Sequence, residues 1–490
     1  MELSKLLENV EVKKITGMIN RNVSGVKTNS KKVVPGDVFV ALAGKKADGH
    51  NYIEEAINLG STVIICNKAY TPIVNNKVTF VAVDDTRVEL HRLVSNFYGD
   101  PSKNFWLIGI TGTNGKTSVS ILANHVYSQL KYKTGVIGTI ENYLNGKPMG
   151  IEKTTPTTPD CCELGLLMSR FRDNAVEKVL MEVSSMALKM HRVDSCRFDV
   201  AVYTNLSQDH LDDHVTMEDY KESKIKLFKI APRAVINLDD KYANEFINSA
   251  GSNVITYGIE SDADVVAKNI LYTANQVVFD VIVKGKYVNT IKLGVPSRFA
   301  VYNALAVIGI CMWDDDVSID DACEILSKEC YIPGRYESVP LKNNRQAIID
   351  FAHTPVALEN LLDAVKDNPS FKRVITVFGC GGNRDSAKRP IMGKISQIYS
   401  DFVIVTSDNP RNEDPESIID DIMKGVELDK GNVLREVDRA KAIRYAYEMS
   451  SEGDVIVIAG KGHEKVQIIK GKNIPFSDKE VLCSIDKSVE

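Results

Sequence analysis

Short strand-like runs alternate with helical patterns along almost the whole chain. The strand-like runs lie at 38–42, 62–65, 79–83, 105–110, 179–183, 200–204, 234–237, 347–350, 374–378, 402–405 and 455–458. Parallel strands need a crossover between them, usually a helix, so this alternation predicts α/β domains with parallel sheets. The segment 264–293 differs, because apolar and polar residues alternate there without a helical pattern, which predicts an antiparallel meander.

Length and turn clusters suggest how the chain divides. At roughly 150 residues per domain, a chain of 490 residues predicts three domains. Turn-forming clusters interrupt the pattern at Gly99-Asp100-Pro101-Ser102 and at Pro333-Gly334. We therefore expect domains at 1–102, 103–333 and 334–490.

Composition excludes several classes of protein. With 60 Lys and Arg against 65 Asp and Glu, the net charge is −5, which argues against nucleic-acid binding because neutralising phosphates needs a basic face. No apolar run reaches the length of about 18 residues that a membrane span needs, and the first residues lack the apolar core of a signal peptide. The nine cysteines show no CxxC spacing, which predicts reduced thiols and a cytoplasmic protein.

The strongest local signal is a glycine-rich loop, Thr-Gly-Thr-Asn-Gly-Lys-Thr-Ser at 111–118, between the strand pattern 105–110 and a helix pattern at 117–129. In a phosphate-binding loop the glycines let backbone N–H groups surround phosphate oxygens, and the helix N-terminus adds positive charge. Lys116 would reach the phosphates and Thr117 would ligate Mg²⁺. Ile110 stands where the strict pattern has its first glycine, so the loop is a variant; the alternative is a plain glycine-rich turn.

Candidate metal ligands follow two of the central strands. Mg²⁺ prefers hard oxygen ligands, and Glu182 lies at the end of the run 179–183. The run 200–204 leads into a polar loop that contains His210 and several aspartates. Glu182 as a helix N-cap or surface residue, and a solvated polar loop, are the alternatives. Lys224, 14 residues beyond His210, would by its spacing alone be a surface lysine.

Together these motifs resemble the Mur ligase superfamily of ATP-dependent amide-forming ligases. The glycine-rich loop, Met-Glu-Val-Ser-Ser at 181–185 and Asp-His-Leu-Asp at 209–212 occur in the family's order. The last third contributes Asp-Phe-Ala-His-Thr-Pro at 350–355, Gly-Cys-Gly-Gly-Asn-Arg-Asp at 379–385, Asp-Asn-Pro-Arg at 408–411 and Gly-Lys-Gly-His-Glu at 460–464. The resemblance covers essentially the whole chain and is closest to the branch that adds the third residue of the peptidoglycan stem peptide.

The resemblance implies a fold and a reaction. It implies an N-terminal UDP-sugar-binding α/β domain, a central P-loop ATPase domain with a mainly parallel sheet, and a C-terminal Rossmann-like domain that binds an amino acid. The implied reaction uses ATP and Mg²⁺ to add meso-2,6-diaminopimelate to UDP-N-acetylmuramoyl-L-alanyl-D-glutamate through an acyl phosphate, in cytoplasmic peptidoglycan synthesis and hence cell-wall biogenesis, cell shape and division. It implies small-molecule partners, no nucleic acid or membrane, and a monomer.

Roles for single residues also come from the resemblance. The residues implied to bind ATP are Gly112, Thr113, Asn114, Gly115, Lys116, Thr117, Ser118, Asn303, Arg335 and His353. The implied Mg²⁺ ligands are Thr117, Glu182, His210 and a carbamylated Lys224, and the implied catalytic residues are Lys116, Glu182, His210 and Lys224. Contacts to the UDP-sugar dipeptide are implied for Ser30, Thr157, Thr158, Ser184 and Arg192. Contacts to the amino acid are implied for Arg384, Asp408, Asn409, Pro410, Arg411, Gly460 and Glu464.

Three residues depart from the family's pattern, and several positions have a structural alternative. Met186, Met190 and Ala300 stand where the family often has His, Gln and Asn. Ser30 as a turn residue, Asn303 as a polar helix contact and Arg411 as a surface arginine are the alternatives for single positions. The rival functions are the L-lysine-adding version of the ligase, a folylpolyglutamate synthase and a P-loop nucleotide switch. Lysine-adding relatives typically lack the arginine of Asp-Asn-Pro-Arg, and a folate substrate needs no UDP-binding domain.

Overall fold

A computed structural model describes residues 1–44, 47–70, 77–209 and 211–488. The chain forms two compact units, and each is described by itself. The first comprises Met1–Gly109, Leu130–Ala201 and Lys226–Pro232, and the second comprises Ile110–Gln129, Val202–Ile225 and Arg233–Glu490. The division into three domains at 102 and 333 stays a prediction. No helix in the described part of the chain is both long and apolar enough to cross a membrane.

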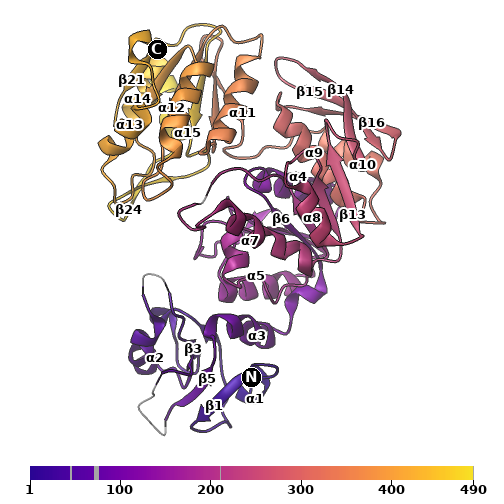
Figure 1. Cartoon of the computed structure of the whole chain (residues 1–490), viewed down its shortest axis with the longest axis vertical. Coiled ribbons are helices and arrows are strands. Elements are labelled where there is room, and N and C mark those ends of the chain that lie inside the picture. The colour runs from indigo at the N-terminus through magenta and orange to yellow at the C-terminus, as the bar shows by residue number, and fades with distance from the viewer. Residues whose placement is uncertain (45–46, 71–76, 210, 489–490) are drawn as a thin grey trace. The chain divides into compact units, whose positions relative to one another are not determined.

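The N-terminal part of the first unit is built on a five-stranded sheet with the order β1-β5-β4-β3-β2 (Figure 1). Its strands are β1 (Val12–Thr16), β2 (Val26–Lys27), β3 (Val38–Val40), β4 (Val63–Asn67) and β5 (Thr79–Val83). The strands β2 to β5 are parallel, and β1 joins β5 in the antiparallel direction. Helices α1 (Leu3–Leu6), α2 (Ile53–Asn58) and α3 (Thr86–Tyr98) accompany it, and Asp85 caps α3 by accepting the Arg87 N–H. The sequence predicted β3, β4 and β5 but neither β1 nor β2.

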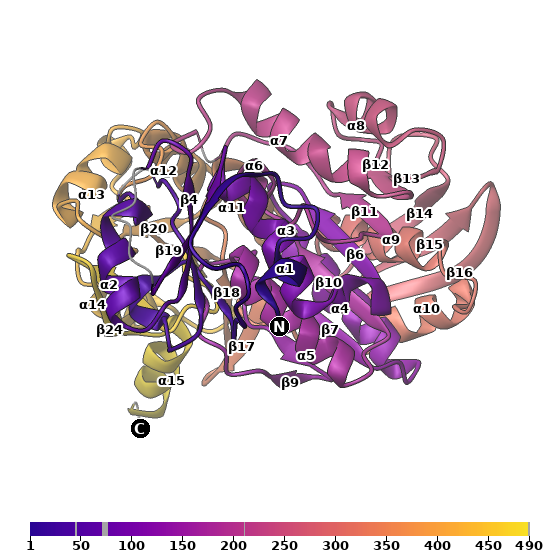
Figure 2. The ribbon, with the colours of Figure 1, turned by 90° about the horizontal axis from the view of Figure 1, so that it is seen from below.

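The central sheet has 11 strands in the order β16-β15-β14-β13-β12-β11-β6-β10-β7-β8-β9. They are β6 (Trp106–Thr111), β7 (Thr134–Ile137), β8 (Tyr143–Leu144), β9 (Lys147–Pro148), β10 (Lys178–Glu182), β11 (Val200–Tyr203), β12 (Ala234–Asn237), β13 (Val254–Gly258), β14 (Val265–Tyr272), β15 (Val277–Val283) and β16 (Lys286–Leu293). The pairs β14–β15 and β15–β16 are antiparallel, so the predicted meander is confirmed (Figures 1 and 2).

Helices lie between several strands of this sheet and after its last strand. They are α4 (Lys116–Gln129), α5 (Cys161–Asp173), α6 (Ser185–Lys189), α7 (Met217–Ile230), α8 (Ala243–Ala250), α9 (Arg298–Cys311) and α10 (Ile319–Leu326). Helix α5 begins at Cys161, whose side chain is buried. All nine cysteines are free thiols. The central part of the chain is therefore the mainly parallel α/β sheet that the alternation predicted, extended by an antiparallel edge.

The last part of the second unit holds a six-stranded sheet with the order β17-β18-β22-β19-β20-β21. Its strands are β17 (Glu337–Leu341), β18 (Arg345–Asp350), β19 (Val374–Phe378), β20 (Phe402–Val405), β21 (Val433–Arg435) and β22 (Val455–Ala459). All pairs are parallel except β17–β18. Because β22 lies between β18 and β19, the strand order reverses there, which is where open α/β sheets bind ligands at the carboxyl ends of strands.

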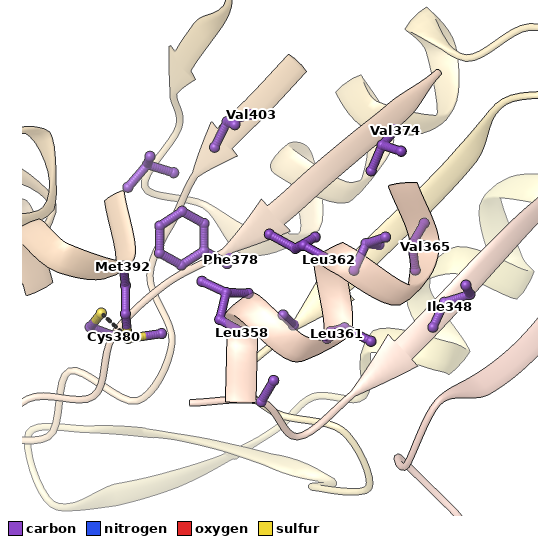
Figure 3. Packing of buried hydrophobic residues seen from close by; sticks show 14 of the residues in the cluster. Ile348, Leu358, Leu361, Leu362, Val365, Val374, Phe378, Cys380, Met392 and Val403 are labelled. Atoms are coloured by element: carbon purple, nitrogen blue, oxygen red, sulfur yellow. Dashed lines mark hydrogen bonds between the residues drawn. The ribbon is translucent and has the colours of Figure 1, made fainter. Parts of the chain in front are cut away.

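The helices of this part are α11 (Pro355–Lys366), α12 (Lys388–Tyr399), α13 (Pro415–Met423), α14 (Arg439–Met449) and α15 (Asp478–Ser488), and a separate hairpin is formed by β23 (Val466–Ile469) and β24 (Lys472–Pro475). Leu358, Leu361, Leu362 and Val365 recur on α11 at helical spacing and pack toward Phe378 of β19 (Figure 3). This buried layer packs against strands whose ends carry the polar motifs. The predicted α/β fold class is confirmed.

Candidate active site

The glycine-rich loop connects β6, which ends at Thr111, with α4, which begins at Lys116. Gly112 and Gly115 have φ angles of 151° and 89°, a region that favours glycine. A Cβ atom at Gly112 would collide with the Thr204 hydroxyl, and one at Gly115 would lie 2.8 Å from Oδ1 of Asn303. Close approach of neighbouring side chains therefore requires both glycines, and the plain-turn alternative does not explain that approach.

The polar segment after β11 supports this loop. The backbone N–H of Thr113 donates to the Asn205 carbonyl at 2.8 Å, and the N–H of Asn114 donates to Asn205 Oδ1 at 3.0 Å. Thr204 Oγ1 donates to the Asn114 carbonyl at 2.6 Å. Thr204 and Asn205 therefore support the loop, although no motif marks them; they lie where the core strand run 200–204 passes into the polar segment.

Two lysines converge on one carbonyl group of the loop. Lys116 Nζ donates to the carbonyls of Gly112 at 2.9 Å and Thr113 at 2.8 Å, and Lys224 Nζ donates to the Gly112 carbonyl at 2.9 Å. Lys224 is 1% exposed, so the surface alternative is wrong. Burial, followed by the nearby charge of Lys116, lowers the pKa of Lys224 well below its usual value, and Asp209 opposes the shift.

Other predicted nucleotide-binding residues gather near the start of α4. Arg335 Nη2 donates to Thr117 Oγ1 at 3.2 Å, and the guanidinium lies 4.5 Å from the centre of the Phe351 ring. The His353 ring lies 4.7 Å from the same ring, with Nε2 3.8 Å from a carboxylate oxygen of Asp209. Asn303 and Ser118 are buried. The Asn303 side chain lies close to Gly115 of the phosphate loop, so its contacts are not limited to its own helix. His210 lies outside the described residues.

Glu182 closes β10, and Thr139 holds both of its carboxylate oxygens. The Thr139 N–H donates to Oε1 and the Thr139 hydroxyl donates to Oε2, each at 2.8 Å. Glu182 is 1% exposed, and the cap of α6 is Ser184, so both alternatives for Glu182 are wrong. A Cβ atom at Gly138 would collide with Oε1 of Glu182, so a glycine is required beside it.

Four predicted substrate residues belong to the same hydrogen-bond network as this glutamate. Thr158 Oγ1 donates to the Glu182 carbonyl at 2.8 Å and accepts the N–H of Ser184 at 2.9 Å. Arg192 Nη1 donates to the Thr158 carbonyl at 3.2 Å, and the Thr157 hydroxyl lies 3.1 Å from that of Thr139.

Ser30, predicted to contact the same substrate, lies in the N-terminal part of the first unit. Its hydroxyl donates to Glu55 Oε2 at 2.5 Å. Ser30 is buried at the start of a short 3-10 helix, Ser30–Lys32. Its role in contacting the substrate stays a prediction.

The residues predicted to bind the amino acid lie just beyond β19, β20 and β22. Asn409 Nδ2 donates to Glu464 Oε2 at 2.8 Å, and Arg411 Nη1 donates to the Gly382 carbonyl at 2.8 Å. A Cβ atom at Gly460 would lie 2.6 Å from Oδ2 of Asp408. The structure therefore brings the Asp-Asn-Pro-Arg loop, which includes Pro410, beside the Gly-Lys-Gly-His-Glu loop.

Arg411 is half-buried and hydrogen-bonded, unlike a free surface arginine. Burial and the neighbouring charge of Arg384 lower the pKa of Arg411 from its usual value, while Asp408 and Glu464 oppose the shift. Arg384 itself donates to Asp212 Oδ2 at 2.9 Å. A half-buried guanidinium beside a second cation is suited to an anionic ligand.

The donor set suits magnesium more than zinc. Among residues 1–44, 47–70, 77–209 and 211–488, no three His, Cys, Asp or Glu side chains cluster as a metal cage. Mg²⁺ is usually held by one or two carboxylates together with waters and substrate phosphates, so it needs no such cage. The resemblance assigns Mg²⁺ to the Glu182 carboxylate and the Thr117 hydroxyl, and each is a hard oxygen donor of the kind that this ion prefers.

Comparison with known proteins identifies the family. Family models match the chain as Mur ligase family, catalytic domain at residues 22–98, Mur ligase middle domain at 110–311, and Mur ligase, glutamate ligase domain at 334–462. The UDP-N-acetylmuramoyl-L-alanyl-D-glutamate–2,6-diaminopimelate ligase 2 of Clostridium acetobutylicum is 43% identical over 484 residues, which is 98% of this chain and 99% of that protein.

Solved structures agree with this relationship. A UDP-N-acetylmuramoyl-L-alanyl-D-glutamate–2,6-diaminopimelate ligase, 29% identical, superimposes with a TM-score of 0.69 and covers 100% of this chain and 99% of its own. The MurF ligase of Thermotoga maritima, solved with ADP, is 20% identical with a TM-score of 0.64, covers 95% of this chain and 97% of its own, and shares the fold. From its phosphate loop to its C-terminal motifs, the chain belongs to the Mur ligase family.

Proposed function

We propose that the chain is an ATP-dependent ligase that joins meso-2,6-diaminopimelate to UDP-N-acetylmuramoyl-L-alanyl-D-glutamate. The observation that carries the proposal is the hydrogen bond of 2.8 Å from Asn409 Nδ2 to Glu464 Oε2, which joins the loop that contains Arg411 to the loop beyond β22. Diaminopimelate ends in a carboxylate and an ammonium group on one carbon, and this site offers a cation and a carboxylate. The similarity of the full chain to ligases with that printed name supports the same reaction.

The phosphate loop supports ATP as the energy source. We propose that the loop residues 112–118 bind the phosphates, with Asn303, Arg335 and His353 around the nucleotide. Lys116 would leave its two loop carbonyls, at 2.9 and 2.8 Å, to neutralise the transferring phosphoryl group. The ADP bound to the Thermotoga maritima MurF ligase, which has the same fold, favours this assignment.

Transfer of the γ-phosphoryl group would convert a poor acyl donor into a reactive one. A carboxylate oxygen of the UDP-sugar dipeptide attacks the γ-phosphorus, ADP leaves, and an acyl phosphate forms. The amino group of the incoming amino acid attacks the acyl carbon, a proton is lost from nitrogen, and phosphate leaves as the amide forms. Mg²⁺ bound at Thr117, Glu182, His210 and a carbamylated Lys224 would supply charge neutralisation for the phosphates.

The rival substrates are less well supported. L-lysine lacks the second carboxylate, so it would leave Arg411 without an anionic partner. A folate substrate would give no role to the segment 22–98, which matches a Mur ligase domain. We place the enzyme in the cytoplasm, where its nine free thiols stay reduced and ATP is available. We propose that it acts as a monomer.

A coupled phosphate-release assay tests the proposal. Phosphate release should require UDP-N-acetylmuramoyl-L-alanyl-D-glutamate and meso-diaminopimelate together, and should be much slower when L-lysine or a folate replaces the matching substrate. Phosphate release that needs no amino acid would indicate a nucleotide switch. Mass spectrometry of the product identifies the bond that is formed.

A further inference from the structure

Lys461, which the sequence analysis did not single out, is a fully buried lysine between Gly460 and the Glu464 loop. Its side chain is 0% exposed. A buried ammonium group is costly unless every N–H finds an acceptor, and a lysine has three. Lys461 Nζ donates to Val466 O at 2.7 Å, to Glu464 Oε2 at 2.8 Å and to Asn409 Oδ1 at 3.1 Å. Its hydrogen-bonding capacity is therefore fully used.

These bonds determine the orientation of the Asn409 amide. Its Oδ1 accepts from Lys461 and also from the N–H of Ile468 on β23, at 2.9 Å. Both partners are donors, so the oxygen must face them and the NH₂ group must face the other way. That NH₂ group donates to Glu464 Oε2. Lys461 and the hairpin thus decide which end of a buried amide faces the binding residues.

The same bonds occupy only one of the two carboxylate oxygens of Glu464. Its Oε2 accepts from both Lys461 and Asn409, each at 2.8 Å. Among the described residues its Oε1 has no hydrogen-bond partner, and the side chain is 29% exposed. Glu464 is therefore a carboxylate bound on one side to a buried cation, with the other oxygen available to a ligand ammonium group.

We propose that Lys461 is a positioning residue that determines the preference for diaminopimelate over lysine. This inference rests on the proposed function. Lys461 orients Asn409 and Glu464, and its charge offsets that of Glu464, so that the site with Arg411 suits a ligand end that carries both charges. Without Lys461, Glu464 would be uncompensated, and a site with excess negative charge favours the purely cationic end of L-lysine.

The test uses Lys461→Met in the full-length enzyme, with exposed Lys465→Met in the same loop as the matched control. We expect the KM for diaminopimelate to rise about tenfold or more, and the preference over L-lysine to fall by about 10- to 150-fold, the range of one charge-assisted hydrogen bond. The KM for ATP and for the UDP-sugar dipeptide should stay within about twofold, because the network contains none of their proposed contacts.

A double-mutant cycle with Glu464→Gln distinguishes an effect of Lys461 on the position of Glu464 from a general disturbance of the fold. If Lys461 acts through Glu464, its loss will change the amino-acid preference much less in the Glu464→Gln background. Lys461→Gln, whose amide NH₂ satisfies two of the three acceptors, provides a milder variant if Lys461→Met does not fold, and it should shift the preference in the same direction.

The outcomes are distinct. Wild-type enzyme that ligates neither amino acid overturns the proposed function and this inference together. Wild-type enzyme that prefers diaminopimelate, with folded Lys461 variants of unchanged preference, overturns only the inference. Effects of Lys461→Met and Glu464→Gln that simply add would also overturn it, because independent residues do not act through one another.

Discussion

Lys224 on α7 donates a hydrogen bond of 2.9 Å to the carbonyl oxygen of Gly112, the first glycine of the phosphate loop. The lysine is 1% exposed, and burial with the charge of Lys116 lowers its pKa well below the usual value. Carbon dioxide reacts with the neutral amine and not with the ammonium group. Burial makes the charged form of this lysine energetically unfavourable. It therefore favours the neutral amine that the proposed carbamylation requires.

Lys224→Ala should lose nearly all ligation, and a small carboxylic acid such as formate should restore part of it by replacing the carbamate. Activity of the wild-type enzyme should fall in CO₂-depleted buffer and return with bicarbonate. Isotope-labelled CO₂ and NMR would detect the carbamate carbon. An unmodified lysine together with a fully active Lys224→Ala would contradict the assignment.

Lys224 should also make stability depend on pH. In CO₂-depleted buffer the folded state releases a proton that the unfolded chain keeps up to its ordinary pKa of 10.5, so wild-type stability rises with pH between the lowered pKa and that value. Lys224→Met removes this contribution to the pH dependence of stability. Urea unfolding should show the variant more stable than wild type at about pH 7, and the difference should shrink toward about pH 10. A difference that is constant with pH would contradict the shift.

Lys116→Ala should abolish ligation while the fold survives. The side chain is only partly buried and it donates hydrogen bonds to two loop carbonyls, so the free energy of unfolding should fall by at most about 2 kcal/mol. Ligation should fall by about 10²- to 10³-fold or more, because a charge that acts on the transferring phosphoryl group is lost. Steady-state kinetics and thermal melts measure both, with exposed Lys147→Ala as the control. Wild-type turnover in Lys116→Ala would refute the role.

Loss of Arg411 should collapse the preference for diaminopimelate over L-lysine. Arg411 has a φ of 53°, which Asn tolerates better than Ala, so Arg411→Asn removes the guanidinium with less backbone strain. We expect the ratio of the two kcat/KM values to fall by about 10- to 150-fold, and exposed Arg444→Ala to leave it unchanged. Equal kcat/KM for the two amino acids in the wild-type enzyme would rule the assignment out.

Gly138→Ala should disturb the proposed metal site without touching the phosphate loop. The new Cβ would collide with Oε1 of Glu182, whereas a Cβ at Gly294 would meet nothing within 4 Å, so Gly294→Ala is the matched control. We expect Gly138→Ala to raise the Mg²⁺ concentration that gives half-maximal activity by about tenfold, the lower end of effects from disturbed outer-shell contacts. An unchanged Mg²⁺ dependence would show that Glu182 does not bind the metal.

Much of the fold was predictable, because strand and helix patterns are local. Strands β5, β12, β19 and β20 have the predicted bounds, and the phosphate loop lies between the strand and helix that its sequence requires. Strands β7, β8, β9, β13, β17 and β21 were not predicted, and neither were β1, β2 and the hairpin β23–β24. The strands β1 and β2 and the hairpin are short and partly exposed, so they lack the apolar alternation on which the prediction depends.

The sequence by itself determined the elements, the family and the chemical types of the site residues, since periodicity and motifs lie within a few neighbouring residues. Spacing alone made Lys224 a surface lysine, and only the family resemblance gave it a role, with no physical reason for its chemistry; no pattern in the sequence marked Lys461. Only the tertiary structure decided those two, because Lys224 meets its partner 112 residues away and Lys461 meets Asn409 52 residues away. Such pairings follow from strand order and packing, and burial gives a charged group its altered chemistry only after those contacts have formed.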